Sequence, residues 1–454
     1  MSRRLYSLLL VLLSPALLAW MALRARRAGG DWAVLGAARF GRYRPGTPAP
    51  AAGAIWIHAV SLGETRAAQP LIRALLDRGH RILLTHLTAT GRAEGGRVYA
   101  AEIGEGRLLQ DWLPYDFPGA TRRFLRHYRP AVGVLIEREV WPNLVHAASR
   151  EDVPLVLASA RLSESALRRT ARLGGLMRQA YARIARIYAQ SLADARRLER
   201  LGGRAVSVSG NFKFDVLPDQ DKAARGRAFA ARLGRRIVAI ASTREGEDLP
   251  FIQAIRRQRD RDEAAGVEAD QPILFLLIPR HPQRFDAAAE QLRAAGLPFV
   301  RRTGLLALGD GGSSALEACR GAAVLLGDTL GEMPWYYAGC QVAIVAGSFA
   351  PLGGQNFIEA SALGCPVIVG PHVANFEQAV ADARAAGALV QADDPGRAVR
   401  QALQWLDDSA ARTRAGEAGR HWVERHAGAV ARVVDGIEGL LARRAPAGPA
   451  APPA

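Results

Sequence analysis

Residues 55–76 of the 454-residue chain read IWIHAVSLGETRAAQPLIRALL and contain a complete structural signal. The first six residues are almost continuously apolar, which is typical of a strand buried on both faces of a sheet. A turn with a glycine follows, and residues 67–76 then show the spacing of an amphipathic helix. A buried strand that passes through a short turn into a helix indicates a parallel sheet covered by helices.

The same alternation of short apolar runs and helical patterns continues along the chain. The expected strands of a first series are residues 55–60, 82–85, 132–136, 154–158, 187–190 and 206–208. Those of a second series are 237–241, 273–278, 324–326, 342–345 and 366–369. The polar stretch 217–236 separates them, so we predict two Rossmann-like domains, 50–216 and 235–443. Ligands of such sheets bind beyond the carboxyl ends of the strands. The Pro/Ala-rich tail 444–454 is expected to be disordered.

The composition limits the function classes. The chain has 60 Lys and Arg against 43 Asp and Glu, a formal charge of +17. A basic chain suits nucleic acid, an anionic membrane or a phosphorylated substrate. The absence of a GxGxxG segment argues against a dinucleotide-dependent oxidoreductase. Three cysteines without CxxC spacing, and histidines without metal-ligand spacing, indicate neither a disulfide framework nor a metal site.

An uncharged stretch of 19 residues, 5–23 (LYSLLLVLLSPALLAWMAL), lies near the N-terminus. As a helix it would be about 28 Å long, close to a hydrocarbon core of ~30 Å. We expect residues 1–27 to form a membrane anchor, with a cleaved signal peptide and a surface-lying helix as alternatives. The denser arginine cluster follows this stretch, which favours a protein body in the cytoplasm.

Acidic side chains follow two of the expected strands. Glu64 lies after strand 55–60 at the start of a helix, where a carboxylate can be a general base for a hydroxyl nucleophile. It can equally cap the helix and complement its dipole. Glu137 and Glu139, in IEREVWPN, end strand 132–136, where two carboxylates are uncommon without partners. One could reach a cleft while the other pairs structurally, or both could lie in a solvated turn.

Lysine is rare in this chain, because 58 of the 60 basic residues are arginine. This bias most simply reflects genome composition, and it makes each lysine notable. Lys213 lies in SGNFKFD, between two aromatic residues and directly after an expected strand. Its ammonium group could neutralise a leaving phosphate, and a salt bridge to Asp215 is the alternative.

The second half contains segments that suit an anionic ligand. ASTREGE, 241–247, offers Ser242 and Thr243 at a helix start, where free amides bind phosphate. IPRHPQRF brings Arg280, which could hold a phosphate bidentately. LLGDTLGEM and the glycine-rich AGSFAPLGGQNFIEA follow further strands, and Glu359 lies where an acidic residue often binds ribose hydroxyls. Their joint placement predicts a nucleotide-binding cleft.

Together these segments resemble the bacterial Kdo (3-deoxy-D-manno-octulosonic acid) transferases of lipopolysaccharide synthesis. The resemblance extends from the N-terminal anchor to about residue 430 and rests on ten ordered segments: HAVSLGET, LPYDFP, EREVWPN, ARLSE, GNFKFD, STREGE, PRHPQRF, GDTLGEM, GSFAPLGGQNFIEA and GPHVANF. It implies the GT-B fold, an α/β architecture of two Rossmann-like domains facing a cleft. It also implies inverting transfer of Kdo from CMP-Kdo to the lipid A precursor, tetraacyldisaccharide 1,4′-bisphosphate, at the cytoplasmic face of the inner membrane, without a cofactor.

The resemblance further implies roles for individual residues. Glu64 would be the proton acceptor, and Glu137 and Lys213 would stabilise the transition state. The CMP contacts would fall on Pro279, Arg280, Leu330, Gly331, Glu332, Asn356, Phe357, Ile358 and Glu359.

The chain departs from the family pattern at four positions that bear on donor or acceptor contacts. Arg244 replaces the His of STHEGE, and Gln355 replaces the His of GGHN. Ser159 replaces the Asn before ARLS, and Arg138 replaces the Thr between the two glutamates.

Two other functions remain open at this point. Another membrane-associated GT-B glycosyltransferase of envelope biosynthesis would use a UDP- or ADP-sugar. A non-catalytic nucleic-acid-binding protein is disfavoured, because the charge concentrates at the apolar N-terminus and no nucleic-acid motif is present.

Overall fold

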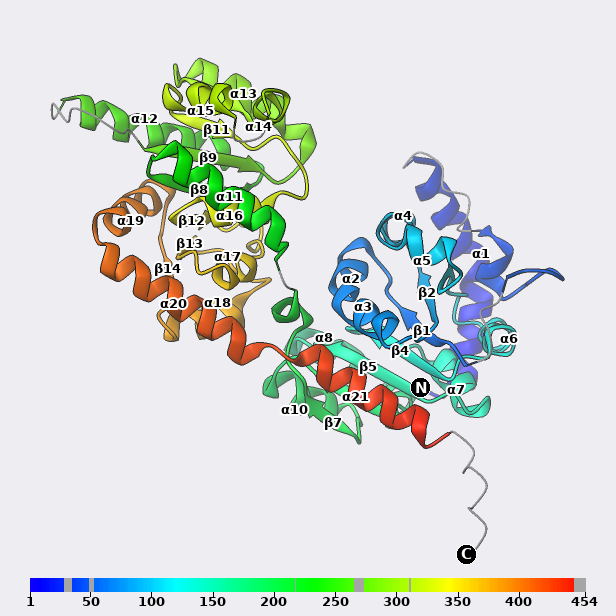
Figure 1. Cartoon of the computed structure of the whole chain (residues 1–454). Coiled ribbons are helices and arrows are strands. Elements are labelled where there is room, and N and C mark those ends of the chain that lie inside the picture. The colour runs from blue at the N-terminus through cyan, green and yellow to red at the C-terminus, as the bar shows by residue number, and fades with distance from the viewer. Residues whose placement is uncertain (28–34, 49–52, 217, 265–272, 310–311, 445–454) are drawn as a thin grey trace, which may run out of the picture. The chain divides into compact units, whose positions relative to one another are not determined.

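The computed structural model describes residues 1–27, 35–48, 53–216, 218–264, 273–309 and 312–444 (Figure 1). The chain divides into two units, and each contains a parallel sheet of seven strands. Unit 1 comprises Met1–Asp215 and His426–Ala454, and unit 2 comprises Val216–Arg425. Two α/β units with parallel sheets confirm the fold expected from the alternation of apolar strands and helices.

The elements of unit 1 alternate along the chain. The strands are β1 (Ile55–His58), β2 (Ile82–His86), β3 (Leu108–Trp112), β4 (Val132–Ile136), β5 (Leu155–Ala160), β6 (Arg186–Ala189) and β7 (Val206–Val208). The helices are α1 (Arg3–Arg27), α2 (Leu62–Ala67), α3 (Gln69–Asp77), α4 (Ala89–Val98), α5 (Ala100–Gly104), α6 (Pro118–Tyr128), α7 (Pro142–Arg150), α8 (Glu164–Ala171), α9 (Gly175–Ala182), α10 (Leu192–Arg200) and α21 (Ala429–Ala442), with short 3-10 turns η2 (Ala37–Phe40) and η3 (Phe212–Asp215).

The sheet of unit 1 has the strand order β3-β2-β1-β4-β5-β6-β7. Strand β1 is central, and Ile55 pairs in parallel with Ile82 of β2 and Val132 of β4. Ile57 packs in a cluster with α3, whereas Trp56 packs on the opposite face with α6 and α7. Both faces of the strand are therefore covered, which explains why its sequence is apolar at consecutive positions.

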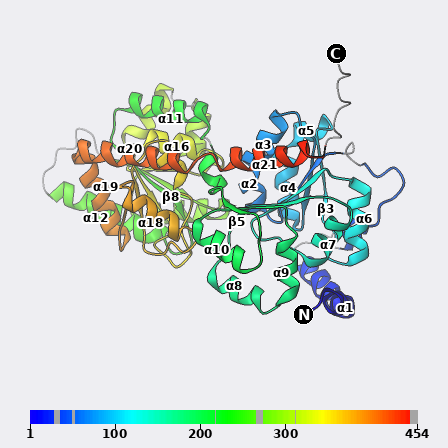
Figure 2. The same cartoon turned by 90° about the horizontal axis from the view of Figure 1, so that it is seen from below.

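The C-terminal helix α21 belongs to unit 1, although it follows unit 2 in the sequence. Its apolar stripe, which includes Val430, Val433 and Ile437, is buried against the same face of the sheet as α3 (Figure 2). Both carboxylate oxygens of Asp215 accept hydrogen bonds at the start of this helix, from the backbone N–H groups of Gly428 and Val430. The expected second domain, 235–443, therefore extends too far, because helical periodicity reports burial without identifying the sheet that is covered.

The elements of unit 2 form the second alternating series. The strands are β8 (Ile237–Thr243), β9 (Leu274–Pro279), β10 (Phe299–Arg301), β11 (Val324–Leu326), β12 (Val342–Val345), β13 (Val367–Val369) and β14 (Leu389–Gln391). The helices are α11 (Gln220–Leu233), α12 (Asp248–Ala264), α13 (Phe285–Ala294), α14 (Arg302–Ala307), α15 (Ser313–Arg320), α16 (Met333–Gly339), α17 (Ile358–Ala362), α18 (Glu377–Ala385), α19 (Pro395–Asp407) and α20 (Ser409–His426), with the 3-10 turn η4 (Pro282–Arg284).

Unit 2 begins earlier than expected. The polar stretch 217–236, predicted only to separate the two series, contains α11, and this helix packs closely on α16. A Cβ atom at Gly226 would approach the carbonyl oxygen of Trp335 to 2.1 Å, so the two helix backbones are in near contact. The polar composition of this stretch predicted only a separating segment. Its glycine and small residues permit tight helix packing instead.

Three strands escaped prediction, and all three lie at sheet edges. Strand β3 ends the sheet of unit 1, and β10 and β14 end the sheet of unit 2, whose order is β10-β11-β9-β8-β12-β13-β14. Several of their residues are only half-buried. An edge strand is covered less completely than a central one, so its sequence lacks the continuous apolar run.

The apolar helix α1 is continuous through Pro15. Among the described residues, its segment 3–23 is the one helix with the length and apolar composition to cross a bilayer. Its first turns are bound to unit 1, because Tyr6 donates to Asp116 and both Arg3 and Ser7 donate to the Asn143 side chain. The predicted tail lies, apart from Arg444, outside the described residues.

Candidate active site

The carboxyl edge of unit 1 contains a topological switch point. Strand β1 lies between β2 and β4, so the chain leaves β1 toward one side of the sheet and β4 toward the other. Ligands of doubly wound sheets bind at this place. Glu64 follows β1, and Glu137 and Glu139 follow β4. The structure thus brings the acidic residues of two distant motifs to adjacent strand ends.

Glu64 caps helix α2 and is also a titratable group near pH 7. Ser61 Oγ accepts from the Glu64 N–H at 3.4 Å, and Glu64 Oε2 accepts from the N–H groups of Val60 (2.6 Å) and Ser61 (3.3 Å). Burial raises the pKa of Glu64 to about 7, and the negative charge of Glu139 adds to this effect. Capping and proton acceptance, the two alternatives from the sequence, are compatible in one side chain.

The loop after β4 holds its two carboxylates differently. Glu139 accepts a hydrogen bond of 3.0 Å from the indole N–H of Trp141, and burial raises its pKa. Glu137 has a left-handed backbone with φ of 62°, while its N–H donates to Ala158 of β5. A residue other than glycine in this conformation stores strain, and such residues cluster at functional sites. Both side chains are half-buried, which argues against a solvated turn.

Lys213 lies at the same edge, after β7. Burial lowers the pKa of its ammonium group, the nearby Glu137 raises it, and the positive charge of Arg161 lowers it. Glu137 also contributes to the raised pKa of Glu64, so it lies within electrostatic range of both other predicted catalytic residues. The structure therefore groups Glu64, Glu137 and Lys213, the three residues that the sequence predicts to be catalytic.

A chain of hydrogen bonds supports the loop that carries Lys213. The Lys213 N–H donates to the Asn211 side chain, and the Asn211 amide donates to Gln190. Gln190 in turn donates to both the carbonyl and the hydroxyl of Ser159, one of the four departures from the family pattern. Ser159 is buried with a φ of 51°, so this departure occupies a supporting position at the end of β5.

Arg161 is a site residue to which the sequence analysis assigned no role. It follows β5 directly, as Glu137 follows β4, and its charge acts on Lys213. Its position at the end of a strand, within the ARLSE segment, could have identified Arg161 as a candidate site residue.

The switch point of unit 2 lies between β8 and β12, and Glu247 joins the two loops there. Its buried carboxylate accepts four backbone hydrogen bonds, from Arg244 at 2.8 Å, Gly347 at 2.7 Å, Phe349 at 2.9 Å and Ala350 at 3.1 Å. The glycine-rich loop after β12 is thus held to the loop after β8 by one anion. No local pattern indicates this role, because Gly347, Phe349 and Ala350 lie 100 to 103 residues after Glu247.

Three arginines gather near the carboxyl ends of β8 and β9. Arg280, Arg244 and Arg284 all help to lower the pKa of His281, after the larger effect of its burial. Arg284 forms an ion pair with the buried Asp248. The Arg280 N–H donates to the Thr243 carbonyl at 2.9 Å, which joins the ends of the two strands. Such a group of guanidinium side chains attracts phosphate.

One expectation for this edge needs correction. Thr243 is the last residue of β8 rather than part of a helix start, and its side chain is fully buried. The carboxylate of Glu332 forms a bidentate ion pair with the buried Arg302, at 2.9 and 3.1 Å, and accepts from Thr329, while the contact of Glu332 with CMP stays a prediction. The arginine that pairs with Glu332 lies 30 residues earlier, so the motif alone does not reveal it.

The neighbouring positions of the predicted CMP set differ in accessibility. Leu330 is 66% exposed, and Gly331 has a φ of 77° in the same turn. Pro279 ends the buried strand β9.

The segment 356–359 combines polar and buried residues. Phe357 and Ile358 are buried, and the Phe357 ring stacks on Trp422 with centroids 5.5 Å apart. Asn356 accepts from the Ile358 N–H, and burial raises the pKa of the Glu359 carboxyl. The contacts of this segment with CMP stay a prediction.

Two α/β units, each with a parallel sheet of seven strands, define the fold class of this protein as GT-B. A glycosyltransferase structure from Rickettsia africae ESF-5 has a TM-score of 0.55 at 12% identity and covers 86% of this chain and 99% of its own. A putative UDP-N-acetylglucosamine 2-epimerase from Listeria monocytogenes has a TM-score of 0.53 at 13% identity, covering 87% and 98%. These likenesses concern the fold alone.

Sequence comparison defines the family more closely. Residues 36–216 match the family model described as 3-deoxy-D-manno-octulosonic-acid transferase (kdotransferase), and residues 320–422 match glycosyl transferases group 1. A 3-deoxy-D-manno-octulosonic acid transferase of Bordetella pertussis is 53% identical over 441 residues, 97% of this chain and 100% of the relative. One from Haemophilus influenzae is 29% identical, covering 98% and 100%. The chain belongs to the 3-deoxy-D-manno-octulosonic acid (Kdo) transferase family, as the ordered motifs predicted, and is a glycosyltransferase.

Proposed function

We propose that the enzyme transfers Kdo, with inversion, from CMP-Kdo to the lipid A precursor, tetraacyldisaccharide 1,4′-bisphosphate, in lipopolysaccharide biosynthesis. The observation that carries this proposal is Glu64, whose carboxylate lies at the switch point of unit 1 with a pKa near 7. A general base is most effective when its pKa lies near the working pH.

The acceptor's primary hydroxyl is the nucleophile in this mechanism. Glu64 takes its proton, and the oxygen forms a bond to the anomeric carbon of Kdo on the face opposite CMP. The bond between that carbon and the CMP phosphate oxygen breaks, and CMP departs with the electron pair. Lys213, whose ammonium group is partly desolvated, stabilises the charge that develops on the leaving phosphate.

Donor binding is assigned to unit 2. Arg280 and Arg244 offer cationic groups to the CMP phosphate. The buried carboxylate of Glu247 fixes the loop 347–350 at this edge, because it accepts the N–H groups of Gly347, Phe349 and Ala350. Glu359 suits the ribose hydroxyls, because it follows the glycine-rich loop. Leu330, Gly331 and Glu332 are assigned to CMP contact, and the ion pair of the Glu332 carboxylate with Arg302 holds this turn in place.

The same proposal includes the location of the enzyme. Helix α1 attaches the body to the anionic inner membrane, with the catalytic units on the cytoplasmic side. The length of its apolar segment and the arginines that follow it support this placement.

A direct assay tests the reaction. The full-length chain is incubated with lipid A precursor and either CMP-Kdo or a UDP-sugar, and the products are examined by mass spectrometry. We expect a mass increase of Kdo with CMP-Kdo alone, and no product from the Glu64→Gln variant. Transfer from the UDP-sugar instead would assign the enzyme to another branch of the GT-B class.

A further inference from the structure

An apolar groove in unit 1 lies between α1 and the loop that follows β4. Its volume is about 370 Å³, within the range of ~300–1,000 Å³ that is usual for ligand pockets. Leu10, Leu17 and Leu18 of α1 form one wall, and Trp141, Pro142 and Met177 contribute to the other. A groove lined in this way suits a hydrocarbon chain.

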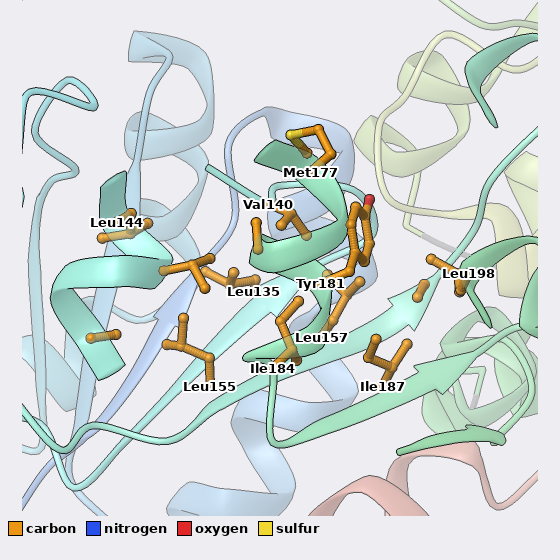
Figure 3. Close-up of a cluster of buried hydrophobic side chains, with 14 of the residues drawn as sticks. Leu135, Val140, Leu144, Leu155, Leu157, Met177, Tyr181, Ile184, Ile187 and Leu198 are labelled. Atoms are coloured by element: carbon orange, nitrogen blue, oxygen red, sulfur yellow. The ribbon is translucent and has the colours of Figure 1, made fainter. Parts of the chain in front are cut away.

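The body side of the groove is firmly built. Val140 and Met177, which both line the groove, belong to the buried core cluster over β4, β5 and β6. Figure 3 shows Met177 at the top of this cluster, away from the strand residues Leu155 and Ile187, with Val140 below it between Leu144 and Tyr181. The groove is therefore a continuation of the core surface, with α1 in place of a further core helix.

The other wall is a helix whose outer face is apolar as well. Leu8, Leu12 and Leu13 point away from the groove and are 55%, 65% and 62% exposed. A surface patch of this kind is stable against hydrocarbon rather than water. A hydrocarbon chain can therefore enter the groove from a lipid phase that contacts the outer face of α1.

The groove is also connected to the candidate catalytic residues. Trp141 lines the groove with its ring, and its indole N–H donates to Glu139 at 3.0 Å. Glu139 in turn contributes to the raised pKa of Glu64, the proposed proton acceptor. Trp141 therefore links the apolar groove to the group of carboxylates that includes Glu139 and Glu64.

We infer that this groove holds one acyl chain of the lipid acceptor and thereby positions the acceptor hydroxyl for Glu64. The inference rests on the proposed function, because it requires an acylated sugar phosphate as acceptor. It assigns Leu10, Trp141 and Met177 to acyl recognition, and it gives α1 a role in substrate binding beyond attachment to the membrane.

Filling the groove tests this role in the full-length enzyme. Leu10→Trp places a large ring in the groove, whereas the matched control Leu13→Trp adds the same ring to the exposed face of the same helix. We expect Leu10→Trp to raise the KM for the tetraacyl acceptor about tenfold and to lower kcat as well, because a displaced acyl chain no longer positions the hydroxyl, while the KM for CMP-Kdo stays near the wild-type value. An acceptor with shortened acyl chains should be used equally well by both variants. Equal KM values for the tetraacyl acceptor in the two variants would overturn the inference.

Photolabelling tests the occupant independently of transfer. Lipid A precursor with a diazirine in its acyl chains is mixed with the wild-type enzyme in vesicles, and labelled peptides are identified by mass spectrometry. Labels on segments around Leu10, Trp141 or Met177, absent with diazirine-phosphatidylethanolamine, support the inference. Equal labelling by both lipids, or labels elsewhere, would contradict it. Specific labelling of an enzyme that does not transfer Kdo would reject the proposed function alone.

Discussion

The two sheets have related topologies, yet the acidic residues at their carboxyl edges serve opposite purposes. In unit 1, Glu64, Glu137 and Glu139 lie within range of one another's negative charge, and the pKa of Glu64 rises to about 7. In unit 2, the Glu247 carboxylate accepts hydrogen bonds from four backbone amides, and the Glu332 carboxylate forms an ion pair with the guanidinium group of Arg302. Acids that face each other are suited to proton transfer, and acids that are already paired are suited to hold loops in place.

Of the variants that test this contrast, Glu64→Gln is expected to lose the most activity. The amide cannot accept the proton, so kcat should fall by roughly 10³-fold, within the usual range for loss of a general base. A glutamine at this position still completes a capping box, so α2 should persist. Steady-state transfer assays measure kcat, and circular dichroism checks the fold.

Ser61→Ala is the control for the structural half of this motif. It removes the hydroxyl that accepts from the Glu64 N–H and should cost about 1 kcal/mol of stability with little loss of kcat. If Ser61→Ala reduced kcat as strongly as Glu64→Gln, Glu64 would have a structural role only.

Glu332→Ala tests the corresponding acid of unit 2. The variant leaves the buried guanidinium of Arg302 without its carboxylate, so the free energy of unfolding should fall by about 3 kcal/mol. Denaturant unfolding measures this loss. Glu317→Ala, which removes an exposed ion pair with Arg320, should cost less than about 1 kcal/mol. A loss of CMP affinity at unchanged stability would instead show that the Glu332 carboxylate acts mainly as a nucleotide contact.

Lys213→Ala should affect the chemical step more than donor binding. We expect kcat to fall by about 10²-fold, because a preorganised cation no longer meets the developing phosphate charge, while the KM for CMP-Kdo changes little. Lys213→Arg keeps the charge and should recover part of the activity. An increase in KM without a decrease in kcat would show that Lys213 contributes to ground-state binding.

The pH dependence of transfer activity is expected to show the smallest effect, and the one most specific to Glu64. Glu64 must be ionised to accept a proton, and burial and Glu139 raise its pKa to about 7. Transfer activity, as kcat/KM, should therefore rise with pH up to about 7 and then level off. Glu139→Gln removes one negative charge and should move this inflection to lower pH. An inflection that stayed in place would mean that Glu139 does not act on Glu64.

Local sequence patterns were sufficient for the fold class and for placing the candidate site residues at strand ends. Continuous apolar strands have to be covered on both faces, and the segments around Glu64, Glu137 and Lys213 follow directly after such strands. The edge strands β3, β10 and β14 were missed, because partial exposure interrupts their apolar pattern. Helix α21 was assigned to the wrong unit, because its periodicity does not identify its partner.

What the sequence determined by itself is the parallel α/β architecture, the apolar N-terminal helix and the residues available at the strand ends. The tertiary structure decided which of those residues meet. It paired Glu332 with Arg302, bound Glu247 to a loop about 100 residues away, buried Thr243, and placed α1 beside Trp141. Burial and pairing depend on neighbours that are distant in the chain, and a local pattern carries no information about their position.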